Sequence, residues 1–180
     1  MAALTLAALG PTNTRAQTAF SAGAGVGTLG TTAAGYVAQL SASIDAPLRG
    51  RTRWWAGLHT GRDADPGVAS PGIRQAVTEL VVSAGPLLPI QLPRAGTLQL
   101  GGGVYGVARR YGAGRVEQTG ETLFSAGYTG GDWGAVARTA LHLPLTRRLG
   151  VLLDGQWRFA YEGTSRRTQP AVAVGVRKVW

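Results

Sequence analysis

Several features of helical membrane proteins, disulfide-bonded proteins and metalloproteins are missing from this sequence. The chain of 180 residues has no cysteine, which excludes disulfides, cysteine-based metal sites and a cysteine lipid anchor. Charged residues make up only 15% of the chain, well below the roughly 25% of typical soluble domains. No apolar run approaches the ~20 residues that a transmembrane helix requires. A helical membrane protein is therefore excluded, and the low charge is unusual for a soluble one.

Glycine and arginine, by contrast, are abundant. There are 28 glycines, and Lys178 is the only lysine among 18 basic residues. The net charge of +9 favours acidic partners such as phosphate-rich lipid, another anionic surface or nucleic acid. The length suits one domain, with enough chain to bury a core or to close one barrel.

The first residues differ in character from the rest of the chain. An apolar stretch at 2–9 is followed by a polar region and by Ala16, a small residue of the kind found at cleavage sites. The basic leader of a full secretory signal is missing. We expect residues 1–16 to be a truncated signal peptide, and residues 17–180 to form the mature domain.

Beyond residue 17 the sequence alternates between apolar and polar or small residues in segments of about ten, separated by turn-forming residues. An even number of segments of this length is typical of tilted membrane strands of ~9 to 11 residues, whereas ordinary strands average about 5 to 6. The pattern predicts an all-β, eight-stranded antiparallel up-and-down transmembrane β-barrel. The eight segments are 18–27, 35–46, 51–60, 73–85, 97–109, 132–143, 149–162 and 169–180.

The connections between these segments fall into two alternating classes. Short links at 47–50 and 144–148, with an intermediate one at 86–96, alternate with polar and mostly longer links. Short periplasmic turns opposite long external loops are typical of outer-membrane barrels. The predicted polar links are 28–34, 61–72, 110–131 and 163–168.

Alternation alone does not decide whether the apolar face points inward, as in a soluble ligand carrier, or outward into lipid. The segment 149–162 has one face without charge, with Trp157 and Phe159 near its loop end. Trp133 lies near the loop end of its own segment, whereas Trp180 lies at the turn end. Aromatic residues grouped at two rims are typical of membrane barrels, so we expect the apolar face to point outward.

Eight strands enclose only enough space for side chains to fill. Charges on the inner face must then pair, because an isolated buried charge is costly. Both signs are present there, which predicts a plugged barrel; a narrow porin is the alternative if water surrounds these charges. The predicted interior polar network is Arg53, Glu79, Arg138, His142, Asp154, Arg158, Glu162 and Arg177.

The last strand carries a local motif, which consists of a glycine, apolar residues at alternate positions after it, and a terminal aromatic residue. The corresponding residues are Gly175, Val176, Lys178 and Trp180. With this motif and architecture, the chain resembles the small eight-stranded outer-membrane proteins of Gram-negative bacteria, the OmpA-transmembrane-domain and OmpX/Ail-like group. The resemblance implies an assembly signal read by the barrel-assembly machinery, contact with periplasmic chaperones during biogenesis, and residence in outer-membrane lipid. Trp180 and Lys178 depart from the Phe and Tyr usual at these positions.

Catalytic chemistry has little support in the sequence. His59 lies near Asp63, Asp65 and Ser70, which leaves a lipid A-modifying enzyme as an alternative, but no nucleophile lies in a recognisable motif. No metal-ligand spacing is present, and no cofactor is expected. We therefore predict a protein that is not an enzyme.

Arginines are common in the segments predicted as long loops and near them. Arginine suits bidentate phosphate contact, so these residues are predicted to contact lipopolysaccharide or a host polyanion. Nucleic acid is not expected, because no interleaved basic helix is present. The predicted role is structural or surface-interacting. The predicted polyanion-contacting residues are Arg62, Arg109, Arg110, Arg115, Arg166 and Arg167.

Overall fold

The computed structural model describes residues 17–28, 36–63, 73–74, 76–93, 96–118, 121–162 and 165–180. Within these ranges no helix is long and apolar enough to cross a membrane. The predicted signal peptide, residues 1–16, lies outside the described residues.

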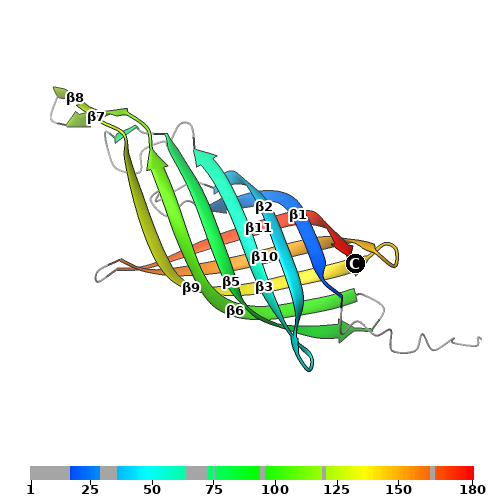
Figure 1. The fold of residues 1–180 in the computed structure, drawn as a ribbon. Helices are drawn as coiled ribbons and strands as arrows, with labels where there is room; N and C mark the ends of the chain where they lie inside the picture. The colour runs from blue at the N-terminus through cyan, green and yellow to red at the C-terminus, as the bar shows by residue number, and fades with distance from the viewer. Residues whose placement is uncertain are drawn as a thin grey trace, which may run out of the picture.

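Eight long strands form a closed antiparallel barrel (Figure 1), arranged around the wall in the order β1-β11-β10-β9-β6-β5-β3-β2. Each barrel strand pairs with the next one along the chain, and β1 pairs with β11 to close the ring. This confirms the predicted eight-stranded up-and-down barrel. The strands are β1 (Ala19–Thr28), β2 (Tyr36–Arg49), β3 (Thr52–Asp63), β5 (Val77–Leu92), β6 (Gly96–Tyr111), β9 (Tyr128–Pro144), β10 (Leu149–Glu162) and β11 (Ser165–Val179).

The other three strands form a small sheet beyond the loop end of the barrel. These are β4 (Ile73–Arg74), β7 (Gly114–Gln118) and β8 (Glu121–Ser125), in the order β4-β7-β8. The segment 110–131 is therefore not the irregular loop that we predicted. Hairpin pairing from Gly114↔Ser125 to Gln118↔Glu121 satisfies backbone groups that a loop would expose.

The link predicted at 86–96 is also mostly strand. Strand β5 continues to Leu92 and β6 begins at Gly96, although Pro86 and Pro89 suggest a turn. Proline has no N–H for the ladder, and the β5–β6 pairing has no partners between Ala84↔Val104 and Leu87↔Gly101. The ladder resumes beyond this gap, so the strand is interrupted without ending.

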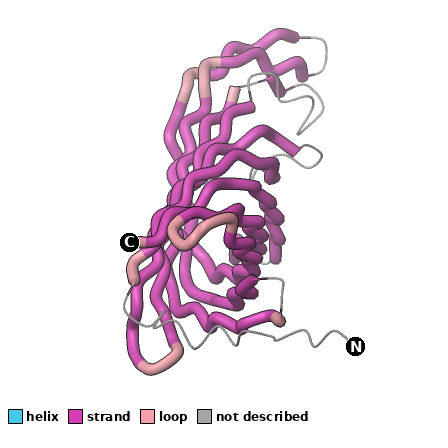
Figure 2. The backbone as a smooth tube through the Cα atoms, turned by 90° about the vertical axis from the view of Figure 1, so that its right-hand side faces the viewer, coloured by secondary structure: helices cyan, strands magenta, loops and turns pink. Residues whose placement is uncertain are grey.

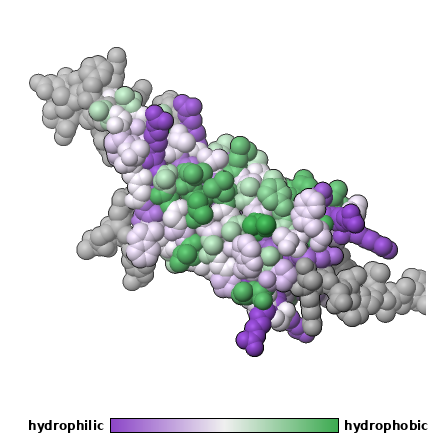
Figure 3. Space-filling model, viewed as in Figure 1, coloured by the Kyte–Doolittle hydropathy of each residue, from purple (hydrophilic) through white to green (hydrophobic). Residues whose placement is uncertain are grey.

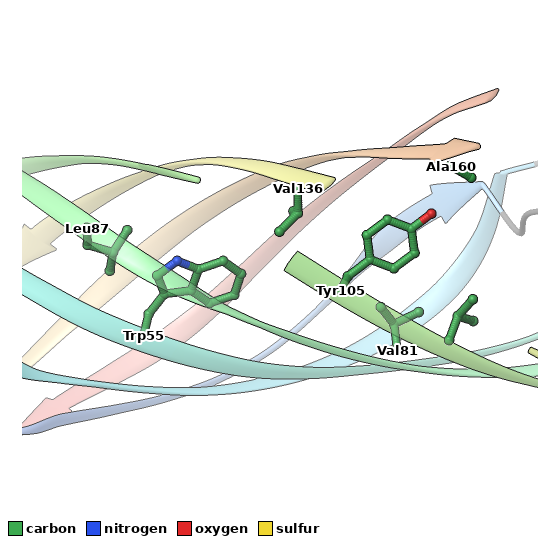
Figure 4. Packing of buried hydrophobic residues seen from close by; sticks show 7 residues of the cluster. Trp55, Val81, Leu87, Tyr105, Val136 and Ala160 are labelled. Atoms are coloured by element: carbon green, nitrogen blue, oxygen red, sulfur yellow. The ribbon is translucent and has the colours of Figure 1, made fainter. Parts of the chain in front are cut away.

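The strands wind around a common axis (Figure 2). Because successive side chains of a strand point to opposite faces, buried and exposed residues alternate along strands such as β5. The interior contains an apolar cluster on one side of the barrel (Figure 4), where side chains from several strands meet. Bulky apolar residues also cover the outer face, where they are exposed. The interior cluster is Trp55, Val81, Leu87, Tyr105, Val107, Val136 and Ala160.

Candidate functional site

The charged side chains inside the barrel form three clusters along its length. The first lies at the turn end and centres on Asp45 of β2. Arg53 Nε donates to Asp45 Oδ2 at 2.6 Å, and Arg177 Nη2 donates to the same oxygen at 2.9 Å. Arg53 also donates to the main-chain oxygen of Gln17. This cluster therefore connects β2, β3 and β11 with the segment just before β1.

The second cluster lies midway along the barrel and centres on Arg138 of β9. Its Nε and Nη2 donate to Oδ1 and Oδ2 of Asp154 at 2.9 and 2.8 Å, a bidentate arrangement that fixes both groups. Nη2 also donates to Ser43 Oγ on β2 at 3.3 Å. The guanidinium carbon lies 4.7 Å from the ring centroid of Trp55, within the range of a cation–π contact.

The third cluster lies toward the loop end and centres on Glu79 of β5. Arg109 Nε donates to Glu79 Oε2 at 2.9 Å, and Arg158 Nη1 donates to Oε1 at 3.1 Å. Glu79 and Arg158 are both 0% exposed. One carboxylate therefore compensates two arginines that would be unfavourable without it.

Side chains fill the interior that these clusters occupy. Two of its cavities have volumes of about 10 Å³ each, room for about one water molecule apiece. Both lie beside Ser41, Asp154 and Ala173. Within the described part of the barrel, side chains that are largely polar occupy the interior, whereas a soluble carrier of the kind weighed from the sequence would need an apolar pocket there.

Most residues of the predicted interior network do face the interior. Six are buried and take part in the three clusters, His142 is half-buried, and the side chain of Glu162 lies outside the described residues. The prediction missed Asp45 and Arg109. Asp45 and Gln39 are both buried and an even number of residues apart on the same strand, so alternation within 35–46 contained the signal. The six are Arg53, Glu79, Arg138, Asp154, Arg158 and Arg177.

None of the six predicted loop arginines lies in a loop. Arg62 is in β3, Arg109 and Arg110 are in β6, Arg115 is in β7, and Arg166 and Arg167 are in β11. The correction is largest for Arg109, whose side chain is buried and ion-paired inside the barrel. Strands that extend beyond the alternating segments contain four of these residues, and β7 contains Arg115. Arg109 is the last residue of the predicted segment 97–109, so its inward parity was already contained in the alternation. The side chains of Arg115, Arg166 and Arg167 lie outside the described residues.

Arg62 and Arg110 are exposed and face outward. Thr78 of β5 pairs with Arg62 on one side and with Arg110 on the other, so the three residues lie in one row across neighbouring strands. Adjacent strands are about 4.8 Å apart, which puts the two arginine backbones about 10 Å apart. The loop end of the outer wall thus presents two exposed arginines in one row, with Thr78 between them.

His59 is buried in the interior and does not lie at an exposed rim. Its Nε2 lies 2.8 Å from Nε2 of Gln156, a hydrogen bond between facing strands. Asp65 and Ser70 lie outside the described residues, as does the side chain of Asp63. No cluster of potential metal ligands occurs within the described ranges.

The four residues of the predicted assembly signal lie on both faces of the last strand. Val176, Lys178 and Trp180 are exposed on the outer face, and the Lys178 Nζ lies 3.8 Å from the ring centroid of Trp180. Gly175 faces the interior and pairs with Gly23 at the seam between the first and last strands. A Cβ on Gly175 would lie 2.3 Å from the Ala22 oxygen, so the glycine permits close approach there.

The outer wall is apolar over its middle and aromatic near both ends. Trp133 and Tyr36, 77% and 70% exposed, lie near the loop end, and Trp54 and Trp180 lie near the turn end. Figure 3 shows apolar side chains gathered over the barrel wall and hydrophilic ones projecting at its ends. The ladder closes into a ring through the β1–β11 pairing, and closure removes the unpaired sheet edges that lipid does not tolerate. These features define a transmembrane β-barrel of the bacterial outer membrane.

Solved structures have the same fold. Ail, the attachment invasion locus protein of Yersinia pestis, matches with a TM-score of 0.55 and 10% identity, over 91% of this chain and 99% of that one. Neisserial surface protein A gives a TM-score of 0.56 and 13% identity, over 90% and 94% of the two chains. A major outer membrane protein of Thermus thermophilus gives 0.53 and 13%, over 91% and 99%.

These likenesses confirm the resemblance to small eight-stranded outer-membrane barrels, which was predicted from the alternating segments and the last strand. No protein-family model matches the sequence, and neither does any curated protein. At 10% to 13% identity, the likeness concerns the fold.

Proposed function

We propose that this outer-membrane barrel is not an enzyme, that its filled interior is structural, and that its loop end binds the phosphate groups of lipopolysaccharide. The observation that carries the proposal is the outward row of Arg62, Thr78 and Arg110. Arginine binds phosphate oxygens bidentately, and Thr78 between them adds a hydroxyl donor.

The position of this row supports a lipid partner. From this row toward the middle of the barrel, the next outward residue of β5 is Leu80, which is exposed. The pair Leu58 of β3 and Val82 of β5 follows, and both of these side chains are also exposed. The arginines therefore lie where the apolar wall ends. Phosphate groups of the outer leaflet lie at that boundary, so the acyl chains of a lipid would contact the apolar wall while its phosphate reaches the arginines.

A neighbour in fold adds support for polyanion contact. Ail of Yersinia pestis has been solved in complex with the heparin analogue sucrose octasulfate. The outward arginines of the present chain would suit a sulfate as well as a phosphate, because both offer several acceptor oxygens. A host polyanion is therefore the second partner to test at the same row.

The double variant Arg62→Gln and Arg110→Gln tests the proposal. Lipopolysaccharide titrated into folded protein should raise the temperature at which the folded gel band is lost, because a ligand of the folded state stabilises it. At about 1 kcal/mol per basic residue near an anionic surface, the variant should bind about 10- to 30-fold more weakly. Added salt should weaken binding by the native protein.

The matched control is Arg147→Gln with Arg148→Gln, an exposed pair at the turn end. It removes the same charge from the opposite end of the barrel and should leave lipopolysaccharide binding unchanged. Equal loss in both variants would show a general effect of charge and overturn the proposal. Binding of sucrose octasulfate without binding of lipopolysaccharide would instead identify a soluble polyanion as the partner.

A further inference from the structure

The exposed charged side chains at the turn end of the barrel, within the described ranges, all have one sign. Arg49 and Arg51 flank the β2–β3 turn, Arg147 and Arg148 lie in the β9–β10 turn, and Lys178 is on the outer face of β11; all five are exposed. Within the described ranges no acidic side chain is exposed at this end. Asp45, the acidic residue there, is 1% exposed and ion-paired inside the barrel. We call the five basic residues the turn-end basic surface.

This surface adjoins the lipid-facing wall. Lys178 pairs with Phe20 of β1 and Leu149 of β10, and both of these apolar side chains are exposed on the outer face. The Lys178 ammonium lies over the ring of Trp180 at 3.8 Å. A cation held against an aromatic ring at the end of an apolar wall lies at the level of lipid headgroups.

The β9–β10 turn lies beside the same strand. The Val179 N–H donates to the Arg148 carbonyl at 2.8 Å, which joins the turn carrying Arg147 and Arg148 to the end of β11. Three of the five basic residues therefore belong to one corner of the barrel. Arg49 and Arg51 flank Gly50, whose φ of +60° makes the tight β2–β3 turn, and they extend the basic surface to another corner.

We infer that the turn-end basic surface binds the phosphate headgroups of anionic phospholipids in the leaflet at the turn end of the barrel. Two observations favour a lipid over a soluble acidic polymer. Lys178 and Trp180 face sideways along the outer wall, and their apolar neighbours would contact the acyl chains of a bound lipid. Phosphodiester oxygens suit arginine, and each basic residue close to an anionic bilayer surface strengthens the attraction.

The inference concerns the opposite end from the lipopolysaccharide row, and it stands if that proposal fails. The tryptophans allow each end to be observed separately, since Trp54 and Trp180 are exposed near the turn end and Trp133 and Trp157 are exposed on the wall toward the loop end. Trp133→Phe with Trp157→Phe leaves exposed tryptophans only near the turn end. Trp55, the remaining one, is buried inside the barrel.

The experiment uses this two-Phe background, folded into phosphatidylcholine vesicles that contain a minor fraction of phosphatidylglycerol. Acyl-chain-brominated phosphatidylglycerol or brominated phosphatidylcholine, at equal fractions, quenches nearby tryptophans. The stronger quenching by brominated phosphatidylglycerol should report that this lipid is about fivefold enriched over phosphatidylcholine near the turn-end tryptophans, which corresponds to about 1 kcal/mol. High salt should reduce this enrichment.

Glutamine at all five positions of the turn-end basic surface, in that background, should make quenching by brominated phosphatidylglycerol equal to quenching by brominated phosphatidylcholine. Arg62→Gln with Arg110→Gln is the control and should leave the enrichment intact. Heat-modified gel mobility checks that each variant is folded. Equal quenching by both lipids before neutralisation would overturn the inference, as would enrichment that survives it. Loss of enrichment on adding poly-glutamate at unchanged ionic strength would overturn the lipid assignment in favour of a carboxylate polymer.

Discussion

Two sides of the barrel interior are built from different residues. The walls of β5, β6 and β9 contribute large apolar side chains such as Val81, Tyr105 and Val136 to one cluster. The neighbouring strands β1 and β11 contribute small residues to the other side, including the paired residues Gly23 and Gly175. The first side is held by packing, whereas the second side is held by close approach of the backbones.

Long polar side chains fill the space beside the seam. Arg138 of β9 donates across the interior to Ser43 on β2, and Arg177 of β11 forms an ion pair with Asp45 of β2 on the seam side. Small residues on the seam side leave room for long arginine side chains, and both water-sized cavities lie against β11 on that side. A narrow barrel can therefore be filled by apolar bulk on one side and by long arginine side chains with their partners on the other.

The largest expected effect comes from Glu79→Gln. It leaves both Arg109 and Arg158 without their carboxylate in the buried loop-end cluster. Breaking a buried ion pair by removing one partner costs about 3–5 kcal/mol, and here one change affects two arginines. We expect the free energy of unfolding to fall by about 4 kcal/mol, measured by urea unfolding in detergent micelles.

The comparison variant is Arg109→Gln, which leaves Glu79 paired with Arg158. Because no charge loses its last partner, the loss should be about 1–2 kcal/mol. A loss in Arg109→Gln as large as that in Glu79→Gln would mean that the carboxylate is not the centre of the cluster. Single-channel recording on both variants reports whether loosening this cluster opens a conducting path.

Alternation in the sequence was enough to predict the charged face of several strands. In 149–162 the period of two puts Asp154 and Arg158 on one face, and in a barrel surrounded by lipid that face is the inner one. The same period extends through 97–109 from Gln99 to Arg109. Arg109 is the last residue of that segment and has the inward parity, but we predicted it to contact a polyanion; its side chain is buried and ion-paired.

The pairing partners inside the barrel could not be predicted. Asp45 and Arg177 are 132 residues apart in the chain, and Arg138 and Ser43 are 95 apart. Which residues meet across a barrel depends on the stagger of all eight strands, and alternation within a single strand does not contain that stagger. The strand ends were missed for a local reason, since Pro86 and Pro89 occur within β5.

The second expected effect tests the packed side. Trp55 is fully buried and contacts Arg138, whereas its neighbour Trp54 faces outward. Trp55→Ala should lower the free energy of unfolding by about 3 kcal/mol. This value is the lower end of the range for large aromatic residues, and we choose it because water can enter the space beside Arg138 and reduce the cost. Trp54→Ala is the control and should cost less, since lipid or detergent fills the space. Equal losses would show that the interior cluster is not packed as described.

The smallest expected effect tests the seam. A Cβ on Gly23 would lie 2.6 Å from the Val174 oxygen, whereas a Cβ on Gly106 of β6 would meet nothing within 4 Å. Gly23→Ala must push β1 and β11 apart, so we expect it to lower the free energy of unfolding by about 1–2 kcal/mol, a cost typical of overpacking. Gly106→Ala should be neutral or slightly stabilising, because alanine loses less backbone entropy than glycine on folding. If the two variants unfolded at the same urea concentration, close approach at the seam would not be what closes this barrel.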